Sequence, residues 1–274
     1  MDKSLQGKAI TASIDPQYPG ARIRCFSRGD TIYEPGLTAF VGYVLEGTIK
    51  LVSYLPDGRT NIVGVIEAPG FFGRIFGIAA EFTIEAATDV RLACFDPAAF
   101  EVQLSESPRL ERSIHIENLH QLEEAHERIV VLACQTIIER LATFLMLRLL
   151  ASEVQSAPGV RTSQVHVPIN RRDLASYLGT TVETISRSLQ ALVRRGTISI
   201  IDSANFRVLK RGDLFRIAGQ NEADLVEMVR RRAPASKVSS IAAAQTRQAA
   251  FWRGEPASPD HSREAVSFQA VAAE

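Results

Sequence analysis

Short apolar or alternating runs, separated by turn signals, fill the chain between about residues 20 and 95. The turn signals are short stretches that contain Gly: Arg28-Gly29-Asp30, Pro35-Gly36, Glu46-Gly47, Asp57-Gly58 and Pro69-Gly70. The runs between them cover residues 42–45, 48–54, 61–66, 83–88 and 90–95. Short strands at a spacing of roughly 8–12 residues are typical of antiparallel sandwiches and barrels. The pattern therefore predicts an antiparallel β-barrel, with its clearest hairpin at Asp57-Gly58.

After Pro108 the pattern becomes helical, and no further Gly or Pro occurs up to Glu153. A stripe of positions recurs at spacings of three and four residues, as in the seam of a coiled coil. Its members are Leu119, Leu122, His126, Ile129, Ala133 and Thr136. A long helix with such a seam most often pairs with a second copy in a symmetric homodimer. The alternative is that the stripe packs onto the chain's own barrel. A second, strongly apolar helix is predicted over residues 137–150.

Residues 168–209 predict a winged helix-turn-helix. Residue types that begin or end helices punctuate this segment at Asn170, Gly179, Thr181 and Gly196. They delimit two helices, residues 171–178 and 182–195, joined by a tight turn. A small hairpin is predicted to follow, with strands at residues 197–201 and 206–209. Two helices joined by a tight turn and followed by a hairpin form a winged DNA-binding module.

The second helix of this module has two faces. The residues expected to face inward are Ile185, Leu189, Leu192 and Val193, and those expected to face outward are Glu183, Thr184, Ser186, Arg187 and Gln190. Arg187 can donate two hydrogen bonds to guanine O6 and N7, and Glu183 can accept one from cytosine N4. Because they are four residues apart, these two side chains point the same way and can orient each other. Such a pair is common on exposed helices, so it indicates DNA recognition only within this helix-turn-helix frame.

The net formal charge of zero, from 31 basic and 31 acidic side chains, hides an asymmetry along the chain. Residues 152–217 contain 10 Lys and Arg against 5 Asp and Glu, whereas residues 1–151 contain 14 against 19. A basic segment next to an acidic one indicates that one part of the chain meets a polyanion. A basic segment is often only a solvated face, however, so the charge alone does not decide.

Cysteine usage and hydropathy bear on the compartment. The three cysteines, Cys25, Cys94 and Cys134, are far apart and form neither a disulfide framework nor a metal-ligand spacing. No apolar run approaches the roughly 20 residues of a membrane helix. The N-terminus also lacks the apolar stretch of a signal peptide. We therefore expect a cytoplasmic protein with reduced thiols and no membrane partner.

Three stretches of the sequence carry a family resemblance: residues 43–51, residues 139–145 and, above all, Leu178-Gly179-Thr180-Thr181-Val182-Glu183-Thr184-Ile185-Ser186-Arg187. From about residue 20 to 217 the chain resembles the Crp–Fnr superfamily of bacterial transcription regulators. With Val182 before the glutamate and Ser186 before the arginine, it is similar to the Fnr/FixK-like branch rather than to the catabolite-activator branch. The resemblance implies an α+β fold with an N-terminal cyclic-nucleotide-binding-like antiparallel β-barrel (jelly roll), a long dimerisation helix and a C-terminal winged helix-turn-helix.

The resemblance also implies a function and its partners. The protein is expected to be a homodimeric transcription regulator that binds double-stranded DNA at inverted repeats of TTGA-type half-sites. It is expected to work with RNA polymerase, as an activator in an oxygen, nitrogen-oxide or stress response. Base contacts are expected from Glu183, Ser186 and Arg187, and phosphate contacts from Arg171, Arg172, Thr181 and Thr184. The dimer interface is expected at Leu119, Leu122, His126, Ile129 and Ala133.

Four segments are expected along the chain. Residues 1–114 form the barrel, residues 115–151 the dimerisation helix and hinge, and residues 152–217 the DNA-binding domain. Residues 218–274 begin with a short helix that ends in Arg230-Arg231-Arg232. This run either touches DNA phosphate or places cations at a helix C-terminus. A largely disordered tail is expected to follow, because Ala, Ser, Pro and Gly occupy 22 of the 42 positions from 233 to 274.

The residues that bind a cyclic nucleotide in this family are replaced here. The family site uses a Phe-Gly-Glu-Leu stretch, whose Glu binds the ribose, and a later Arg-Ser or Arg-Thr, whose Arg pairs with the cyclic phosphate. The corresponding stretches are Phe72-Gly73-Arg74-Ile75 and Glu81-Phe82-Thr83, so cyclic AMP is not expected. The cysteine cluster of Fnr is also absent, so an iron–sulfur cluster is not expected. No cofactor is therefore predicted.

Several signal inputs stay open. They are haem with an axial ligand among His115, His120, His126 and the cysteines, an organic effector in the barrel, oxidation of Cys25 or Cys134, and no signal through the barrel at all. An enzyme of the metal-binding cupin type requires a His-x-His plus Glu set on the strands. No His occurs before His115, and no nucleophile elbow, P-loop or dinucleotide fingerprint is present. An enzymatic function is therefore not expected.

Overall fold

The computed structural model describes residues 18–35, 40–76, 82–156 and 161–232, and every structural statement below concerns these ranges. The strands of the N-terminal half are β1 Arg22–Phe26, β2 Thr31–Tyr33, β3 Val41–Glu46, β4 Thr48–Tyr54, β5 Thr60–Glu67, β6 Gly70–Phe72, β7 Thr83–Ala86 and β8 Val90–Phe95. The helices are α1 Pro97–Glu106, α2 Pro108–Cys134, α3 Ile137–Gln155, α4 Arg171–Tyr177, α5 Val182–Arg194, α6 Arg211–Ala218 and α7 Glu222–Arg232. The strands of the C-terminal half are β9 Gln164–His166, β10 Ile198–Ile200 and β11 Asn205–Val208.

Two four-stranded antiparallel sheets form the N-terminal half, in the orders β1-β8-β3-β6 and β2-β7-β4-β5. The predicted antiparallel barrel is confirmed. The predicted hairpin is also confirmed, because Tyr54 pairs with Thr60 across the turn. Gly58 has a φ of +82° in this turn, a left-handed conformation that favours glycine. Strand β5 lies at the edge of its sheet, which leaves outer backbone groups for another element to pair.

The pattern of apolar positions did not reveal β1, β2, β6, β9, α1 and α6. Strands β2, β6 and β9 have three residues each, too few to establish an alternation. Helix α1 does carry a local start signal, since the side chain of Asp96 accepts a hydrogen bond from the N–H of Ala99 and Pro97 follows. This signal directly follows the predicted strand at residues 90–95, and the helix was not predicted.

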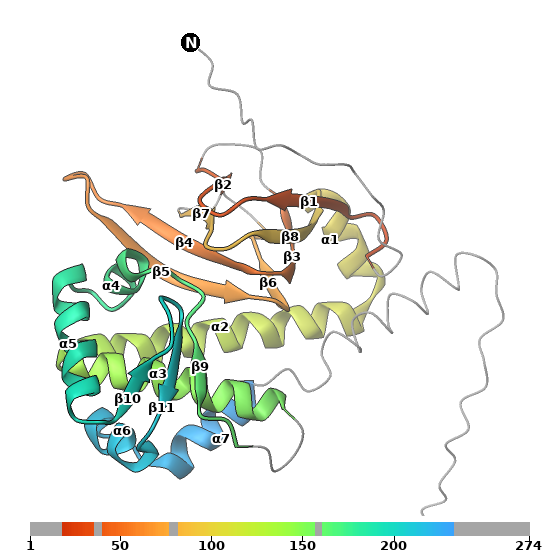
Figure 1. Ribbon diagram of the computed structural model, residues 1–274. Helices are drawn as coiled ribbons and strands as arrows, with labels where there is room; N and C mark the ends of the chain where they lie inside the picture. Colours follow the sequence, from red (N-terminus) through yellow and green to blue (C-terminus); the bar gives the residue numbers. More distant parts are fainter. Residues whose placement is uncertain (1–17, 36–39, 77–81, 157–160, 233–274) are drawn as a thin grey trace, which may run out of the picture.

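Helix α2 runs beneath the barrel, and α4 of the C-terminal half lies beside the barrel strand β5 (Figure 1). It begins behind Ser107, whose hydroxyl accepts a hydrogen bond from the N–H of Leu110, and it ends before Gln135. Helix α3 then begins with a capping box formed by Thr136 and Glu139. Both predicted helices are confirmed. Residue 115, where the sequence pattern places the start of the dimerisation segment, lies inside α2.

The two sides of α2 differ in exposure. Leu110 and Ile114 face the barrel and are buried. The predicted dimer stripe lies on a different face, where Leu119, Leu122 and Ile129 are 58%, 50% and 62% exposed. The alternative that this stripe packs onto the chain's own barrel is therefore wrong.

Helix α3 forms the centre of the C-terminal half. Its large buried side chains are Leu141, Leu145, Met146, Leu149 and Leu150, and α5, α6, α7 and β9 pack around it. The apolar character of this helix therefore reflects a protein core. Within the described ranges, the helices lack the combination of length and hydropathy needed to cross a bilayer.

Arg140, in the first turn of α3, connects three elements. Its guanidinium donates from Nε to the carbonyl of Gln135 at 2.9 Å, from Nη1 to that of Leu178 at 3.0 Å and from Nη2 to that of Leu132 at 2.7 Å. These carbonyls belong to the α2–α3 corner, the end of α4 and the last turn of α2. A single side chain thus satisfies acceptors that helix ends leave without partners.

We expect Arg140→Met to lower the free energy of unfolding by about 2–3 kcal/mol, because three carbonyls lose a charged donor at once. Urea denaturation monitored by circular dichroism measures this change. Arg112→Met on the exposed side of α2 is the matched control, and it should stay within about 0.5 kcal/mol of the wild type. Equal stability of the two variants would contradict the prediction.

Candidate nucleic-acid interface

Helices α4 and α5 and the turn between them form the helix-turn-helix. Asn170 caps α4, since its Oδ1 accepts from the N–H of Asp173 at 2.9 Å. Thr181 caps α5, since its Oγ1 accepts from the N–H of Thr184 at 3.3 Å. Gly179 lies in the turn with a φ of +66°, a conformation that side-chain-bearing residues disfavour. These predicted start and turn positions are confirmed.

The inner face of α5 is close to the prediction, with one exception. Ile185, Leu189 and Leu192 are buried in the core of the C-terminal half. Val193, also expected to face inward, is 37% exposed. It is rotated by about 100° from Leu192 around the helix and lies in the last turn, where fewer neighbours cover it.

The outer face of α5 presents Glu183, Ser186 and Arg187 to solvent. The Nη2 of Arg187 donates to Thr184 Oγ1 at 3.3 Å, and that oxygen lies 3.1 Å from Thr181 Oγ1. The acceptor that orients Arg187 is therefore Thr184 rather than Glu183. Thr184, which is half-buried, links the cap of the helix to its exposed arginine.

Glu183 occupies the first turn of α5, where backbone N–H groups favour a negative charge. Hydrogen bonds from its own backbone N–H and from the Thr181 side chain hold the pKa of Glu183 below its usual range. The nearby Arg187 guanidinium also lowers this pKa, but it is the smallest of these causes. At neutral pH the side chain is thus an anionic acceptor, as a contact to an amino group requires.

The two arginines predicted to contact phosphate have different surroundings. Arg172 is exposed on α4. Arg171 is half-buried, with its guanidinium 4.9 Å from the ring centre of Phe206, and burial lowers its pKa. The exposed side chain of Arg172 can therefore reach a DNA backbone, whereas Arg171 is packed against the ring of Phe206 on β11.

The wing is a three-stranded sheet in the order β10-β11-β9 rather than the predicted hairpin alone. Asp202 closes its turn, because its carboxylate accepts from the N–H groups of Ala204 and Asn205 at 2.8 Å each. A hydrogen bond from the Asn205 side chain, followed by these two backbone hydrogen bonds, holds the pKa of Asp202 below its usual range. Arg207 is exposed on β11, between the buried Phe206 and Val208. Arg207 was not among the residues predicted to contact DNA, although the alternation along the strand marks it as an outward position.

The expected dimer stripe is exposed along its whole length. Leu119, Leu122, His126, Ile129 and Ala133 all lie on the surface of the chain. Two further apolar side chains of α2, Ile116 and Val130, are 38% and 60% exposed. These two positions flank the stripe and were not predicted, because they do not fall on its spacing of three and four residues. An exposed apolar patch of this kind marks a protein-interaction surface.

Apolar side chains fill most of the barrel interior, and the half-buried Arg24 of β1 lies beside them, with its guanidinium 5.3 Å from the ring centre of Phe26 and 5.1 Å from that of Phe40. The side chains that fill the interior are Phe26, Ile32, Tyr33, Val44, Ile49, Phe72, Ile84, Ala86, Val90, Leu92 and Cys94. Arg74 is exposed, and so is Phe82. Glu81 lies outside the described residues. That cyclic AMP is not bound therefore stays a prediction, which rests on Arg74 and Phe82 at the positions of the family's two polar anchors.

The cysteines and histidines are dispersed. Burial raises the pKa of Cys94 to about 12, so this thiol is a poor nucleophile. Cys25 is half-buried and Cys134 is exposed. His115 and His126 are exposed on α2. Among the described residues, these side chains form no group of three or more that could hold a metal ion.

Comparisons with known protein families match both halves of the chain. Residues 23–107 match the cyclic nucleotide-binding domain, and residues 139–217 match the Crp-like helix-turn-helix domain. The solved structure of FixK2 from Bradyrhizobium japonicum superposes with a TM-score of 0.64 at 24% identity, covering 72% of this chain and 96% of that one. The α+β fold predicted from the sequence is therefore confirmed.

The chain is also similar to named regulators, and each match covers most of the relative's own length. The nitrogen fixation regulation protein FixK of Bradyrhizobium diazoefficiens is 33% identical over 210 residues, which is 73% of this chain and 86% of the relative. The transcriptional activator protein FnrL of Cereibacter sphaeroides is 29% identical over 202 residues, which is 72% of this chain and 81% of the relative.

We expect the Glu183 carboxyl to titrate below the usual range of glutamate. Thr181→Ala should raise this pKa more than Arg187→Ala does, because the hydrogen bond has a larger effect than the nearby charge. The stabilisation of the helix by the carboxylate is present at neutral pH and is lost as the pH falls through the lowered pKa. Carbon-13 NMR of the side-chain carboxyl measures all three values. A larger shift in the arginine variant would contradict the assignment.

Proposed function

Because the chain belongs to the Crp–Fnr family of DNA-binding transcription regulators, we propose that it binds inverted repeats of TTGA-type half-sites as a homodimer. The observation that carries this proposal is the capped helix α5, which exposes Glu183, Ser186 and Arg187 on one face. As a member of a family of transcription regulators, the protein is not an enzyme.

Base recognition in this proposal rests on complementary hydrogen bonds in the major groove. Arg187 donates twice to guanine O6 and N7, and Thr184 restrains its guanidinium before DNA arrives. Glu183 accepts from cytosine N4, which its lowered pKa favours. Ser186, one residue before the arginine, contacts a neighbouring base edge. The resemblance to the Fnr/FixK-like branch supports the TTGA sequence.

Phosphate contacts hold the module on the duplex without selecting its sequence. We assign the main contact to Arg172, because its side chain is exposed. Thr181, Thr184 and Arg171 remain assigned to phosphates as well, with Arg171 limited to the reach that its packing on Phe206 allows.

Dimerisation is proposed through the exposed α2 stripe. In a parallel pair of α2 helices, Leu119, Leu122, His126, Ile129 and Ala133 face their counterparts at alternating spacings of three and four residues. Two recognition helices then lie about one DNA turn, ~34 Å, apart. Inverted repeats follow from the two-fold symmetry of such a dimer.

We propose that the regulator is an activator that works with RNA polymerase. Support comes from the relatives, since FixK is named for nitrogen fixation regulation and FnrL is named as a transcriptional activator. An oxygen, nitrogen-oxide or stress response is the process that we assign to it. Activity in this proposal does not depend on cyclic AMP, because Arg74 and Phe82 replace the two residues that bind the cyclic nucleotide in this family.

Replacing Arg187 with Ala should cost about 1–3 kcal/mol at the cognate repeat and relax the preference for the guanine of TTGA. Replacing the exposed Arg172 with Ala is the matched comparison. That change should weaken specific and random DNA by similar factors and reduce the salt slope by about one unit.

Competition binding on operators varied one base at a time, at fixed salt, measures the difference between these variants. Retention of full guanine discrimination by the Arg187→Ala variant would show that α5 does not select this base.

Replacing Leu122 and Ile129 together with Asp should give monomers, because two charges enter an apolar seam in each protomer. Sedimentation gives the mass, and gel shift gives the affinity for the repeat, which should fall at least tenfold as avidity is lost (about one 1.4 kcal/mol step). Glu123→Asp, on an exposed position beside the stripe, serves as the control. A wild-type monomer that binds the repeat tightly would contradict the dimer proposal.

A further inference from the structure

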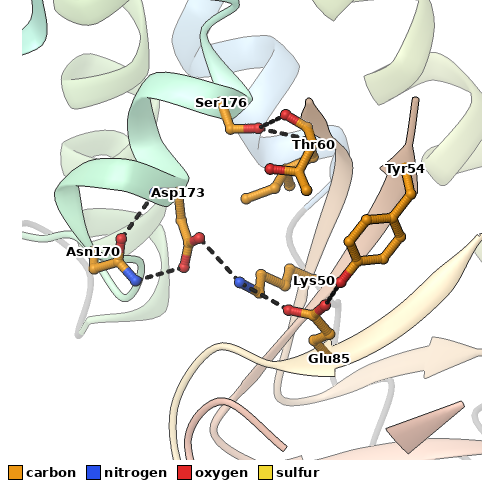
Figure 2. A network of polar contacts seen from close by, with 8 residues as sticks. Lys50, Tyr54, Thr60, Glu85, Asn170, Asp173 and Ser176 are labelled. Carbon is orange, nitrogen blue, oxygen red and sulfur yellow. Dashed lines mark hydrogen bonds and ion pairs between the residues drawn. The ribbon is translucent and has the colours of Figure 1, made fainter. Parts of the chain in front are cut away.

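An ion pair joins the barrel to the helix-turn-helix. Lys50 on β4 places its Nζ 3.0 Å from Asp173 Oδ1 on α4 and 3.1 Å from Glu85 Oε2 on β7 (Figure 2). The side chains of Lys50, Asp173 and Glu85 are only 13%, 10% and 14% exposed. One ammonium group thus neutralises two largely buried carboxylates, one from each half of the molecule.

Both carboxylates are themselves held in place. Asp173 Oδ2 accepts from Asn170 Nδ2 at 2.8 Å, and the same asparagine caps α4. Glu85 accepts a hydrogen bond from the hydroxyl of Tyr54, and this bond raises the pKa of Tyr54 to about 12. Lys50 therefore binds to a prearranged pair of acceptors, and the position of α4 is tied to the barrel through its first turn.

A second contact lies about one turn further along α4, at the edge strand β5. Ser176 Oγ donates to the carbonyl of Thr60 at 2.8 Å and accepts from the N–H of Ile62 at 3.1 Å. Arg128 of α2 donates to the carbonyls of Ile62 and Tyr177. Its guanidinium also lies 4.3 Å from the ring centre of Tyr177. Elements α2, β5 and α4 therefore meet at one point.

These contacts fix the orientation of α4 relative to the barrel. Helices α4 and α5 pack against each other, so a constraint on α4 also orients α5. The residues of α5 that face solvent are not covered by the barrel, since Glu183, Ser186 and Arg187 stay exposed while α4 is docked. The docked arrangement thus leaves the recognition face open to DNA.

We propose that Lys50 and Asp173 are positioning residues for DNA binding: their ion pair fixes the direction of α5 relative to α2 and thereby the half-site spacing that the dimer accepts. The inference rests on the proposed homodimer and its inverted repeat. Neither residue touches DNA in this arrangement. Their effect passes through α4.

Removal of the lysine has a clear physical consequence. Without the ammonium, Asp173 and Glu85 face each other as two poorly solvated negative charges, and a charge left unpaired in such a place is strongly unfavourable. Separation of α4 from β4 relieves this repulsion. The recognition helix then samples several directions, and no single half-site spacing is favoured.

The test compares the full-length wild type with Lys50→Met, which keeps the aliphatic stem and removes the charge. The probes are synthetic duplexes with the TTGA-type inverted repeat at its best spacing, the same repeat lengthened or shortened by one base pair, and a single half-site. We expect the variant to lose about fivefold or more in affinity at the best spacing. Its discrimination between spacings should collapse, while its affinity for the single half-site stays unchanged.

Arg59→Met is the matched control, because Arg59 forms an exposed ion pair with Asp57 at the tip of the same hairpin and makes no ion pair to α4. It should behave as the wild type on every duplex. Asp173→Asn should reproduce the loss of spacing discrimination, and the Lys50→Met, Asp173→Asn double variant should add little to either single change. Circular dichroism and sedimentation check that each variant is folded and dimeric.

Three outcomes would overturn the inference. In the first, the Lys50→Met dimer keeps its spacing preference. In the second, it loses affinity equally for all duplexes, including the half-site. In the third, it binds the repeat more tightly than the wild type. A wild-type chain that is monomeric or ignores inverted repeats would instead refute the proposed function, and this result is seen before any variant is compared.

Discussion

The corner between α2 and α3 determines how the two halves of the molecule are joined, and one guanidinium holds it. Arg140 donates to the carbonyls of Leu132, Gln135 and Leu178, which belong to the end of α2, the corner itself and the end of α4. Helix ends leave carbonyl groups without intrahelical partners. Because one cation satisfies two such ends, the turn of the helix-turn-helix is attached to the helix that carries the exposed apolar stripe.

A second constraint acts along the side of α4 that faces the barrel, where the barrel presents an edge strand. An open sheet edge exposes unpaired backbone groups, which proteins commonly cover. Here Ser176 and Arg128 occupy the backbone groups of Thr60 and Ile62 on β5. Lys50 and Asp173 add a charged contact beside them. The DNA-binding module is thus the element that covers the barrel edge, so the barrel can influence where α5 points.

The recognition helix itself depends on local chemistry. Thr181 caps it, Gly179 provides the left-handed turn before it, and Ile185, Leu189 and Leu192 bury one face. Glu183 and Arg187 are left outside because the helical period separates them from that face. These features need only short-range interactions, which explains why residues 178–187 were the most specific of the three stretches that carried the family resemblance.

The sequence by itself determined the elements whose signals are local: the hairpin at Asp57-Gly58, the caps Asn170 and Thr181, the long helix after Pro108 and the outward face of α5. Tertiary structure decided the rest. Lys50 and Asp173 are 123 residues apart, and neither lies in a pattern that marks a partner. The three-residue strands become strands only through pairing with distant neighbours. Such contacts depend on how complete elements dock, and no periodicity within one element encodes that arrangement.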